Sequence, residues 1–216
     1  MSVVSPNLRT RVRAIATPIA VAMGKVGLTP NGLTLIGFGI AIVAAIVAAL
    51  QVWVIAGVLV VFGGVFDLFD GGLARATGTT SKLGAFMDSV FDRWGEGVIY
   101  IGIAFGCVNQ FPVGAALSTA ALASAFMVSY ARAKSEGLGF TEGTGMAAVG
   151  LAPREVRIVI LTIGLILAGA MGGVYSVSNG ALALSAALGL ITVLATITVL
   201  QRISHVIRQP IPEEHP

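Results

Sequence analysis

All four aspartates of the 216-residue chain, Asp67, Asp70, Asp88 and Asp92, lie close together in an apolar region. The first two are three residues apart and the last two are four apart, so each pair faces one way on a helix. A bare charge at the centre of a membrane helix costs on the order of 3 kcal/mol. Carboxylates without a nearby histidine or cysteine favour a hard cation: Mg²⁺, with Mn²⁺ or Ca²⁺ as substitutes. Four of them can hold two ions, the arrangement that serves phosphoryl transfer.

The composition indicates a polytopic membrane protein. The chain is 56% hydrophobic and 11% charged, with a mean hydropathy of +0.94, whereas a soluble domain is about a quarter charged. The first 26 residues are basic and amphipathic, and they lack the pattern of a cleavable signal peptide. A single cysteine, Cys107, excludes an intrachain disulfide.

Six apolar segments are long enough to cross a hydrocarbon core, which takes about 20 helical residues. They are too long and too continuous for strands. The predicted fold is an all-α integral membrane protein with six transmembrane helices. These are expected near residues 32–50, 52–74, 83–108, 112–134, 155–174 and 178–201.

The basic residues predict the orientation. With six spans, all thirteen lysines and arginines lie toward one side, which the positive-inside rule assigns to the cytosol. Both termini and the aspartates are then cytosolic, in a multi-pass protein of the cell membrane. Residues 1–26 are expected to form an amphipathic helix on the cytosolic leaflet, kinked at Pro18; the alternative is a basic tail that only sets orientation. One membrane domain is expected over residues 1–208, and a disordered tail over 209–216.

The aspartates lie at the cytosolic end of the second span and the start of the third. Because only about eight residues connect these spans, we expect neighbouring antiparallel helices whose carboxylates converge. Gly71 and Gly84 are expected to make room for a ligand beside the metals. Gly63 and Gly64 are expected to serve close helix packing.

The pattern D-x2-D-G-x2-A-R-x8-G-x3-D-x3-D is fully present, and it resembles the motif of the CDP-alcohol phosphatidyltransferases. Its positions are Asp67, Asp70, Gly71, Ala74, Arg75, Gly84, Asp88 and Asp92. The family's six-helix architecture agrees with the predicted spans. The resemblance implies displacement of CMP from a CDP-linked lipid, such as CDP-diacylglycerol, by the hydroxyl of an acceptor alcohol.

The resemblance also implies residue roles. Asp67, Asp70 and Asp88 would ligate two Mg²⁺ ions, with Asp92 near or on one of them and acting as general base. The CDP-lipid would be bound by Asp67, Gly71, Ala74, Arg75 and Gly84. "GLTPNGLTLIG" resembles the nucleotide-contacting stretch through Asn31 and Thr34, and Ser81 resembles a donor-contacting position more weakly. The first stretch is equally a helix start, with Thr29 capping and Pro30 in the first position.

The second half is expected to bind the acceptor. Its polar residues resemble a pattern of bacterial phosphatidylinositol phosphate synthases, although Arg132 stands where lysine is expected. A cationic pocket would suit a phosphorylated polyol such as inositol 1-phosphate. Glycerol 3-phosphate is the rival acceptor, and the donor could be diacyl or diether. The alternative role of these cations is orientation in the membrane. The residues are Ser129, Arg132, Lys134, Arg154, Arg157 and Arg202.

A cation transporter that uses the aspartates as an ion site is the alternative from another class. The acids lie at one face rather than the midplane, and no inverted repeat is visible, which favours the enzyme. The family resemblance implies a homodimer, and nucleic acid is not an expected partner. Glu96, one turn beyond Asp92, is expected to hydrogen-bond nearby polar groups or to pair with Arg93.

Overall fold

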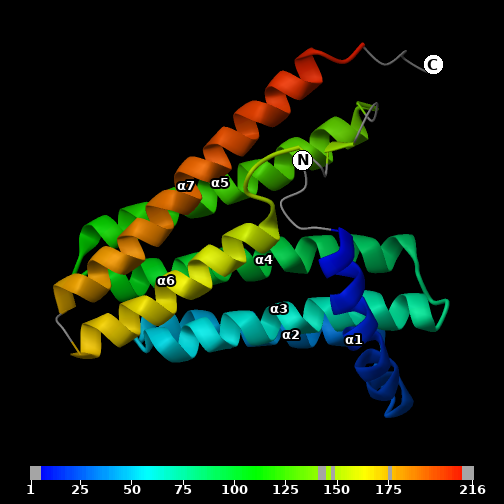
Figure 1. The fold of residues 1–216 in the computed structure, drawn as a ribbon, viewed down its shortest axis with the longest axis horizontal. Helices are drawn as coiled ribbons and strands as arrows, with labels where there is room; N and C mark the ends of the chain where they lie inside the picture. Colours follow the sequence, from blue (N-terminus) through cyan, green and yellow to red (C-terminus); the bar gives the residue numbers. More distant parts are fainter. Residues whose placement is uncertain (1–5, 141–144, 147–148, 175–176, 211–216) are drawn as a thin grey trace.

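The computed structural model describes residues 6–140, 145–146, 149–174 and 177–210, and within these ranges the secondary structure is entirely helical (Figure 1). The six expected apolar segments all form helices with nearly the expected bounds, and a further helix precedes them. The helices are α1 (Pro6–Lys25), α2 (Pro30–Ala49), α3 (Trp53–Ala76), α4 (Lys82–Cys107), α5 (Pro112–Gly137), α6 (Arg154–Val174) and α7 (Val177–Ile207).

Helices α2 to α7 pack as a closed ring. Going round the ring, the main packing partners are α2 with α4, α4 with α5, α5 with α7, α7 with α6, α6 with α3, and α3 with α2. The buried core inside is built from small and aliphatic side chains of all six helices, among them Ala44, Ile103 and Leu188. The expectation that α3 and α4 pack directly on each other was wrong, because both pack on α2 instead. This leaves a space between the two helices that carry the aspartates.

Small residues bring α2 and α4 close together. A Cβ added at Gly102 would collide with the backbone of Ala45, and one at Gly106 would meet Ala48 and Trp53. Such contacts are typical of helix packing in membranes, where lipid removes the hydrophobic driving force between helices. Because α2 also packs on α3, this tight contact helps to position both aspartate-bearing helices.

The helix starts follow their local sequence. The Thr29 hydroxyl accepts a 3.1 Å hydrogen bond from the amide of Gly32, and Pro30 is the first residue of α2, which confirms the expected cap. Ser81 caps α4 in the same way, through the amide of Gly84 at 3.0 Å. These caps set the depth at which each helix begins.

Five of the described helices, α2, α3, α5, α6 and α7, are long and apolar enough to cross a membrane. Helix α4 has 26 residues but carries Asp88, Asp92 and Arg93 in its first half and Glu96 just past its midpoint. The count of six spans therefore stays a prediction. Figure 1 shows the α3–α4 turn and the C-terminal ends of α5 and α7 at one end of the bundle. Because many of the charged residues belong to or adjoin these parts of the chain, this is the charged end.

Helix α1 lies across the bundle and packs on α3 (Figure 1). Its Ala20 is fully buried with Leu33 and Leu73, and Pro18 lies inside the helix. The expected helix before the first span is therefore present. Its interfacial position, the extent of the single domain and the disordered tail stay predictions; residues 1–5 and 211–216 lie outside the described residues.

Candidate active site

The four aspartates line one cleft of about 830 Å³ at the charged end of the bundle. Helix α3 contributes Asp67 and Asp70, and α4 contributes Asp88 and Asp92. The opposite wall comes from α5, α6 and α7. Of the sequence-predicted site residues, it holds Ser129, Arg132, Arg154, Arg157 and Arg202. The structure thus brings both halves of the predicted site to one cleft.

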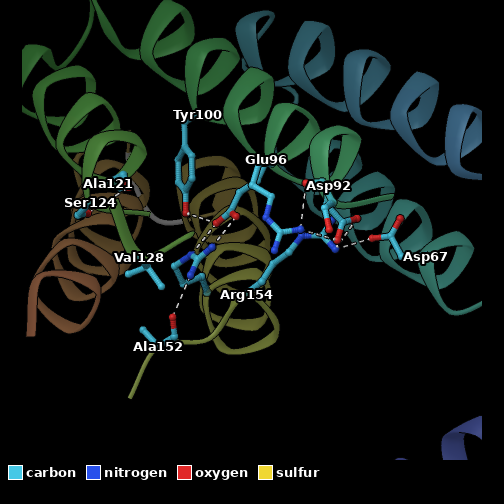
Figure 2. Close-up of polar contacts among 12 residues, drawn as sticks. Asp67, Asp92, Glu96, Tyr100, Ala121, Ser124, Val128, Ala152 and Arg154 are labelled. Atoms are coloured by element: carbon cyan, nitrogen blue, oxygen red, sulfur yellow. Dashed lines mark hydrogen bonds and ion pairs between the residues drawn. The ribbon is translucent and has the colours of Figure 1, made fainter. Parts of the chain in front are cut away.

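Arg154, the first residue of α6, bridges the two aspartate-bearing helices (Figure 2). Its Nη1 lies 2.7 Å from Asp67 Oδ2 and 2.9 Å from Asp92 Oδ1. Arg93 Nη1 lies 3.4 Å from the other oxygen of Asp92. Arg154 is distant from the aspartates in the chain, so their local spacing does not predict these contacts.

The residues fit a divalent cation as a set of donors. The donors at the cleft are carboxylate oxygens, which suit hard cations, and Asp88 and Asp67 repel each other across it. Among the residues that the structure describes, however, no three acidic, histidine or cysteine side chains are grouped so that they could hold one ion as they stand. A bound cation would therefore require the carboxylates to turn toward one another and Asp67 and Asp92 to loosen their contact with Arg154.

Thr34 is placed differently from its expected role. It is buried on α2, and its hydroxyl donates a 2.7 Å hydrogen bond to Asp70 Oδ2. It does not line the cleft. Thr34 thus orients an aspartate that the sequence predicts as a metal ligand.

The glycines near the aspartates differ in their surroundings. A Cβ at Gly71 would lie 3.0 Å from Arg75 Nη1, so the glycine lets this guanidinium lie against the helix backbone. A Cβ at Gly63 would meet Ile40 at 3.5 Å, as expected for helix packing. The packing role expected for Gly64 was wrong, because no atom lies within 4 Å of its Cβ position and the residue lines the cleft.

Asn31, Ser81 and Gly84 form a second small group where α2 and α4 begin. A Cβ at Gly84 would lie 3.1 Å from Ser81 Oγ and 3.5 Å from Asn31 Oδ1. Neither these three residues nor Ala74 line the 830 Å³ cleft. Asn31 belongs to the start of α2, Ala74 to the last turn of α3, and Ser81 and Gly84 to the start of α4, all outside the cleft.

Arg157 is tied to Glu96 in the interior. Its Nε and Nη2 donate 2.7 Å hydrogen bonds to Glu96 Oε1 and Oε2, and its Nη1 donates to Ala152 O at 2.9 Å. Figure 2 shows Glu96 beside Tyr100, one turn from Asp92 on α4. Of the two roles expected for Glu96, the hydrogen bond to a nearby polar group is confirmed, because the Tyr100 hydroxyl donates to it at 3.4 Å. The pairing with Arg93 was wrong, because the cation that pairs with Glu96 comes from α6.

Arg202 is also buried, and it holds the connection between α5 and α6. Its guanidinium donates to Val149 O at 3.1 Å and to Val128 O. Thr198, one turn earlier on α7, accepts hydrogen bonds from the amides of Leu151 and Ala152. Together they hold residues 149–152 just before Arg154.

The remaining predicted acceptor residues lie at the end of α5. Ser129 and Arg132 line the cleft. Arg132 also forms a half-exposed 2.9 Å ion pair with Glu136, and surface pairs of this kind contribute little stability. Lys134 is exposed and does not line the cleft. Arg132 can therefore leave its ion pair with Glu136 and bind a ligand in the cleft with little loss of stability.

Comparison with known proteins decides the family. The family model for CDP-alcohol phosphatidyltransferases matches residues 27–205. The chain belongs to the CDP-alcohol phosphatidyltransferase family. It is 35% identical over 197 residues to an archaetidylinositol phosphate synthase of Pyrococcus horikoshii, covering 91% of this chain and 93% of the relative.

Solved structures of the phosphatidylinositol phosphate synthase of Mycobacterium tuberculosis show the same fold, at 26% identity. The form with CDP-DAG bound has a TM-score of 0.80 and covers 94% of this chain and 100% of that one. The form in complex with manganese and citrate has a TM-score of 0.79, with 93% of each chain covered. The all-α membrane fold and the family resemblance are therefore confirmed, and the protein is an enzyme of this family rather than a cation transporter.

In this CDP-alcohol phosphatidyltransferase, sequence reasoning missed the partners that hold the site together. Glu96 and Arg157 were not expected to pair, and Thr34 was assigned to the nucleotide. One signal was present: Glu96 lies one turn further along the predicted span than Asp92, and an acid inside a span needs a partner such as a cation. The sequence did not show which arginine would supply it.

Proposed function

We propose that this enzyme transfers a phosphatidyl-type group from CDP-diacylglycerol, or a related CDP-lipid, to the hydroxyl of inositol 1-phosphate, giving phosphatidylinositol phosphate and CMP. The observation that carries the proposal is the single cleft with four aspartates on one wall and arginines on the other. The first wall suits a metal-bound pyrophosphate, and the second suits a phosphorylated acceptor. The names of the relatives support the choice of an inositol phosphate product.

The aspartates bind the donor through metal. Asp67, Asp70 and Asp88 would hold divalent cations, for which we propose two Mg²⁺ ions with Mn²⁺ as a substitute. When bound, the ions supply positive charge to the pyrophosphate oxygens. The manganese complex of the mycobacterial relative supports this assignment.

The nucleotide is proposed to lie along the start of α2 and the α3–α4 turn. Arg75, beside Gly71, adds charge against the pyrophosphate. Asn31 and Ser81 are grouped at Gly84 and would bind the cytidine side, with Ala74 leaving room for it. Thr34 contributes to donor binding indirectly, because its hydroxyl orients the Asp70 carboxylate by a hydrogen bond.

Asp92 is proposed as the general base. It lines the cleft and contacts Arg154 at the cationic start of α6, which also contacts Asp67, so it borders both substrates. The acceptor oxygen attacks the phosphorus that carries the lipid, its proton passes to the Asp92 carboxylate, and the bond to the CMP oxygen breaks. CMP leaves with the electron pair of that bond.

The acceptor phosphate is proposed to bind Arg154, Arg132 and Ser129, with Lys134 at the entrance. Arg157 and Arg202, also predicted as acceptor residues, line the cleft but donate to protein acceptors. We assign them to shaping this pocket rather than to direct binding. The site would face the cytosol together with both termini, and the enzyme would work as a homodimer in the cell membrane.

An acceptor panel tests the proposal. Purified enzyme with Mg²⁺ and labelled CDP-diacylglycerol receives inositol 1-phosphate, inositol, glycerol 3-phosphate or serine, and CMP release is measured. Inositol 1-phosphate is expected to give the fastest release, and Arg154→Ala is expected to raise the KM for this acceptor more than that for the donor. Faster release with glycerol 3-phosphate would instead make the enzyme a phosphatidylglycerophosphate synthase. A matched diether CDP-lipid shows whether the product is the archaetidyl form.

A further inference from the structure

A buried ion pair connects α4 to α6 behind the cleft. Arg157 is 1% exposed and Glu96 is 6% exposed, and two parallel bonds of 2.7 Å join them. The third nitrogen of Arg157 donates to Ala152 O. Every nitrogen of this guanidinium therefore has a protein partner, and neither charge is offered to a substrate.

The pair stands one turn from two residues of the site. On α4, Glu96 follows Asp92 by four residues, and on α6, Arg157 follows Arg154 by three. Residues at these spacings share a helix face. The contacts Asp92–Arg154 and Glu96–Arg157 are thus two successive links between the same two helices, and Figure 2 shows Asp92 and Glu96 side by side on α4.

These two side-chain links join α4 and α6, whose backbones are not main packing partners. Helix α6 packs mainly on α3 and α7, whereas α4 packs mainly on α2 and α5. The start of α6 follows a connection that returns from α5, and Arg157 binds that connection at Ala152. The position of Arg154 relative to α4 therefore depends on long side chains rather than on packed backbone.

The pair also keeps Glu96 away from Arg154. Glu96 and Arg154 line one small cavity, and Asp67 and Asp92 line the same cavity. If Arg157 were absent, Glu96 would be an uncompensated carboxylate whose nearest remaining cation on α6 is Arg154. Arg154 would then be drawn from Asp67 and Asp92 toward Glu96.

Stability alone does not explain such a pair, because buried ion pairs can often be replaced by apolar side chains without loss. We propose that Glu96 and Arg157 are positioning residues that fix the start of α6 against α4, so that Arg154 stays at the cleft beside the aspartates and is not drawn to Glu96. The catalytic consequence rests on the roles proposed above for Asp92 and Arg154. The positional claim stands on the contacts alone.

The test uses distances and kinetics together. Spin labels at Ala85→Cys on α4 and Glu155→Cys on α6, both exposed positions, report the separation of the helices; the native Cys107 is buried. The distance distribution is measured in the wild-type background and with Glu96→Met, Arg157→Met, or both. Tyr100→Phe is the matched control, because it removes one 3.4 Å hydrogen bond to Glu96 and leaves the ion pair intact.

The double variant is expected to fold but to show a shifted or broader distance distribution. Its kcat should fall at least tenfold and its acceptor KM should rise, while CDP-lipid affinity stays within twofold. Tyr100→Phe should match wild type in both measurements. A double variant with the wild-type distance distribution, or with wild-type kcat and acceptor KM, overturns the inference.

The test also separates a failure of the double variant to fold from a failure of the proposed function. If the double variant does not fold, Arg157→Lys decides, because lysine keeps the charge but lacks the two-pronged contact; a wild-type acceptor KM in that variant overturns the inference. If the wild-type enzyme releases no CMP with any acceptor, the proposed function fails. The distance measurement still decides whether the pair positions α6.

Discussion

The hydroxyl of Thr34 on α2 donates a 2.7 Å hydrogen bond to Asp70 Oδ2 on α3. Both side chains are buried. The other carboxylate oxygen, Oδ1, accepts a hydrogen bond from the Gly71 amide at 2.5 Å, so protein donors orient both oxygens of Asp70. Loss of a group that orients a metal ligand typically lowers metal affinity or activity by about 10- to 100-fold.

Replacing Thr34 tests this orienting role. Thr34→Val keeps the shape but removes the donor, so we expect the Mg²⁺ concentration for half-maximal CMP release to rise by about tenfold. Thr34→Ser keeps the hydroxyl and should stay close to wild type. Equal Mg²⁺ requirements in the valine and serine variants would mean that the bond does not prepare Asp70 for metal.

Asp92→Asn tests the proposed base. The amide keeps the size of the side chain but cannot accept the proton of the acceptor hydroxyl, so turnover should fall by at least 10²-fold. CDP-lipid binding should remain, because three aspartates still serve the donor. Binding is measured with labelled CDP-diacylglycerol in Mg²⁺. Near-normal turnover would remove Asp92 from the role.

Gly64→Leu tests whether the cleft is the working site. No atom lies within 4 Å of a Cβ at Gly64, which lines the cleft, so leucine should fold there and obstruct the substrates. We expect CMP release to fall more than tenfold with an unchanged melting temperature. Gly39→Leu is the matched control, because its Cβ position is equally open but lies outside the cleft. Equal activity of the two variants would place the reaction elsewhere.

Arg202→Ala tests the structural role that its contacts indicate. The guanidinium binds Val128 O and Val149 O, and losing hydrogen bonds to a buried charged group costs about 1.5–3 kcal/mol. Thermal unfolding in detergent should therefore start at a clearly lower temperature. Arg208→Ala, at an exposed position near the end of α7, should change little. An Arg202→Ala protein as stable as wild type, with only the acceptor KM raised, would return Arg202 to direct acceptor binding.

The helices and the composition of the cleft were predictable, because both depend on patterns local in the sequence. Long apolar runs set α2 to α7, the cap at Thr29 followed from residue types, and the spacing of the aspartates set their shared faces. The ring order was not predictable. A short connection between α3 and α4 suggested direct packing, but close glycine and alanine contacts place α2 between them.

The sequence also did not predict which charged residues pair. Asp92 pairs with Arg154, and Glu96 pairs with Arg157, which is 61 residues away in the chain. Residue types showed that each acid needs a cation, but several arginines were available. Only the fold decides which arginines become buried supports, as Arg157 and Arg202 do, and which remain open to a ligand, as Arg132 does.

The central claim is that the aspartates of α3 and α4 bind divalent ions that hold the CDP-lipid. It is tested most directly by diffraction from crystals grown with Mn²⁺ and CDP-diacylglycerol, with Asp67→Ala and Asp88→Ala proteins as controls. The account predicts anomalous peaks between the two helices, contacting the aspartates and the pyrophosphate, that are lost or weakened in both variants. Ordered CDP-diacylglycerol in the cleft without any anomalous peak at the aspartates would contradict it.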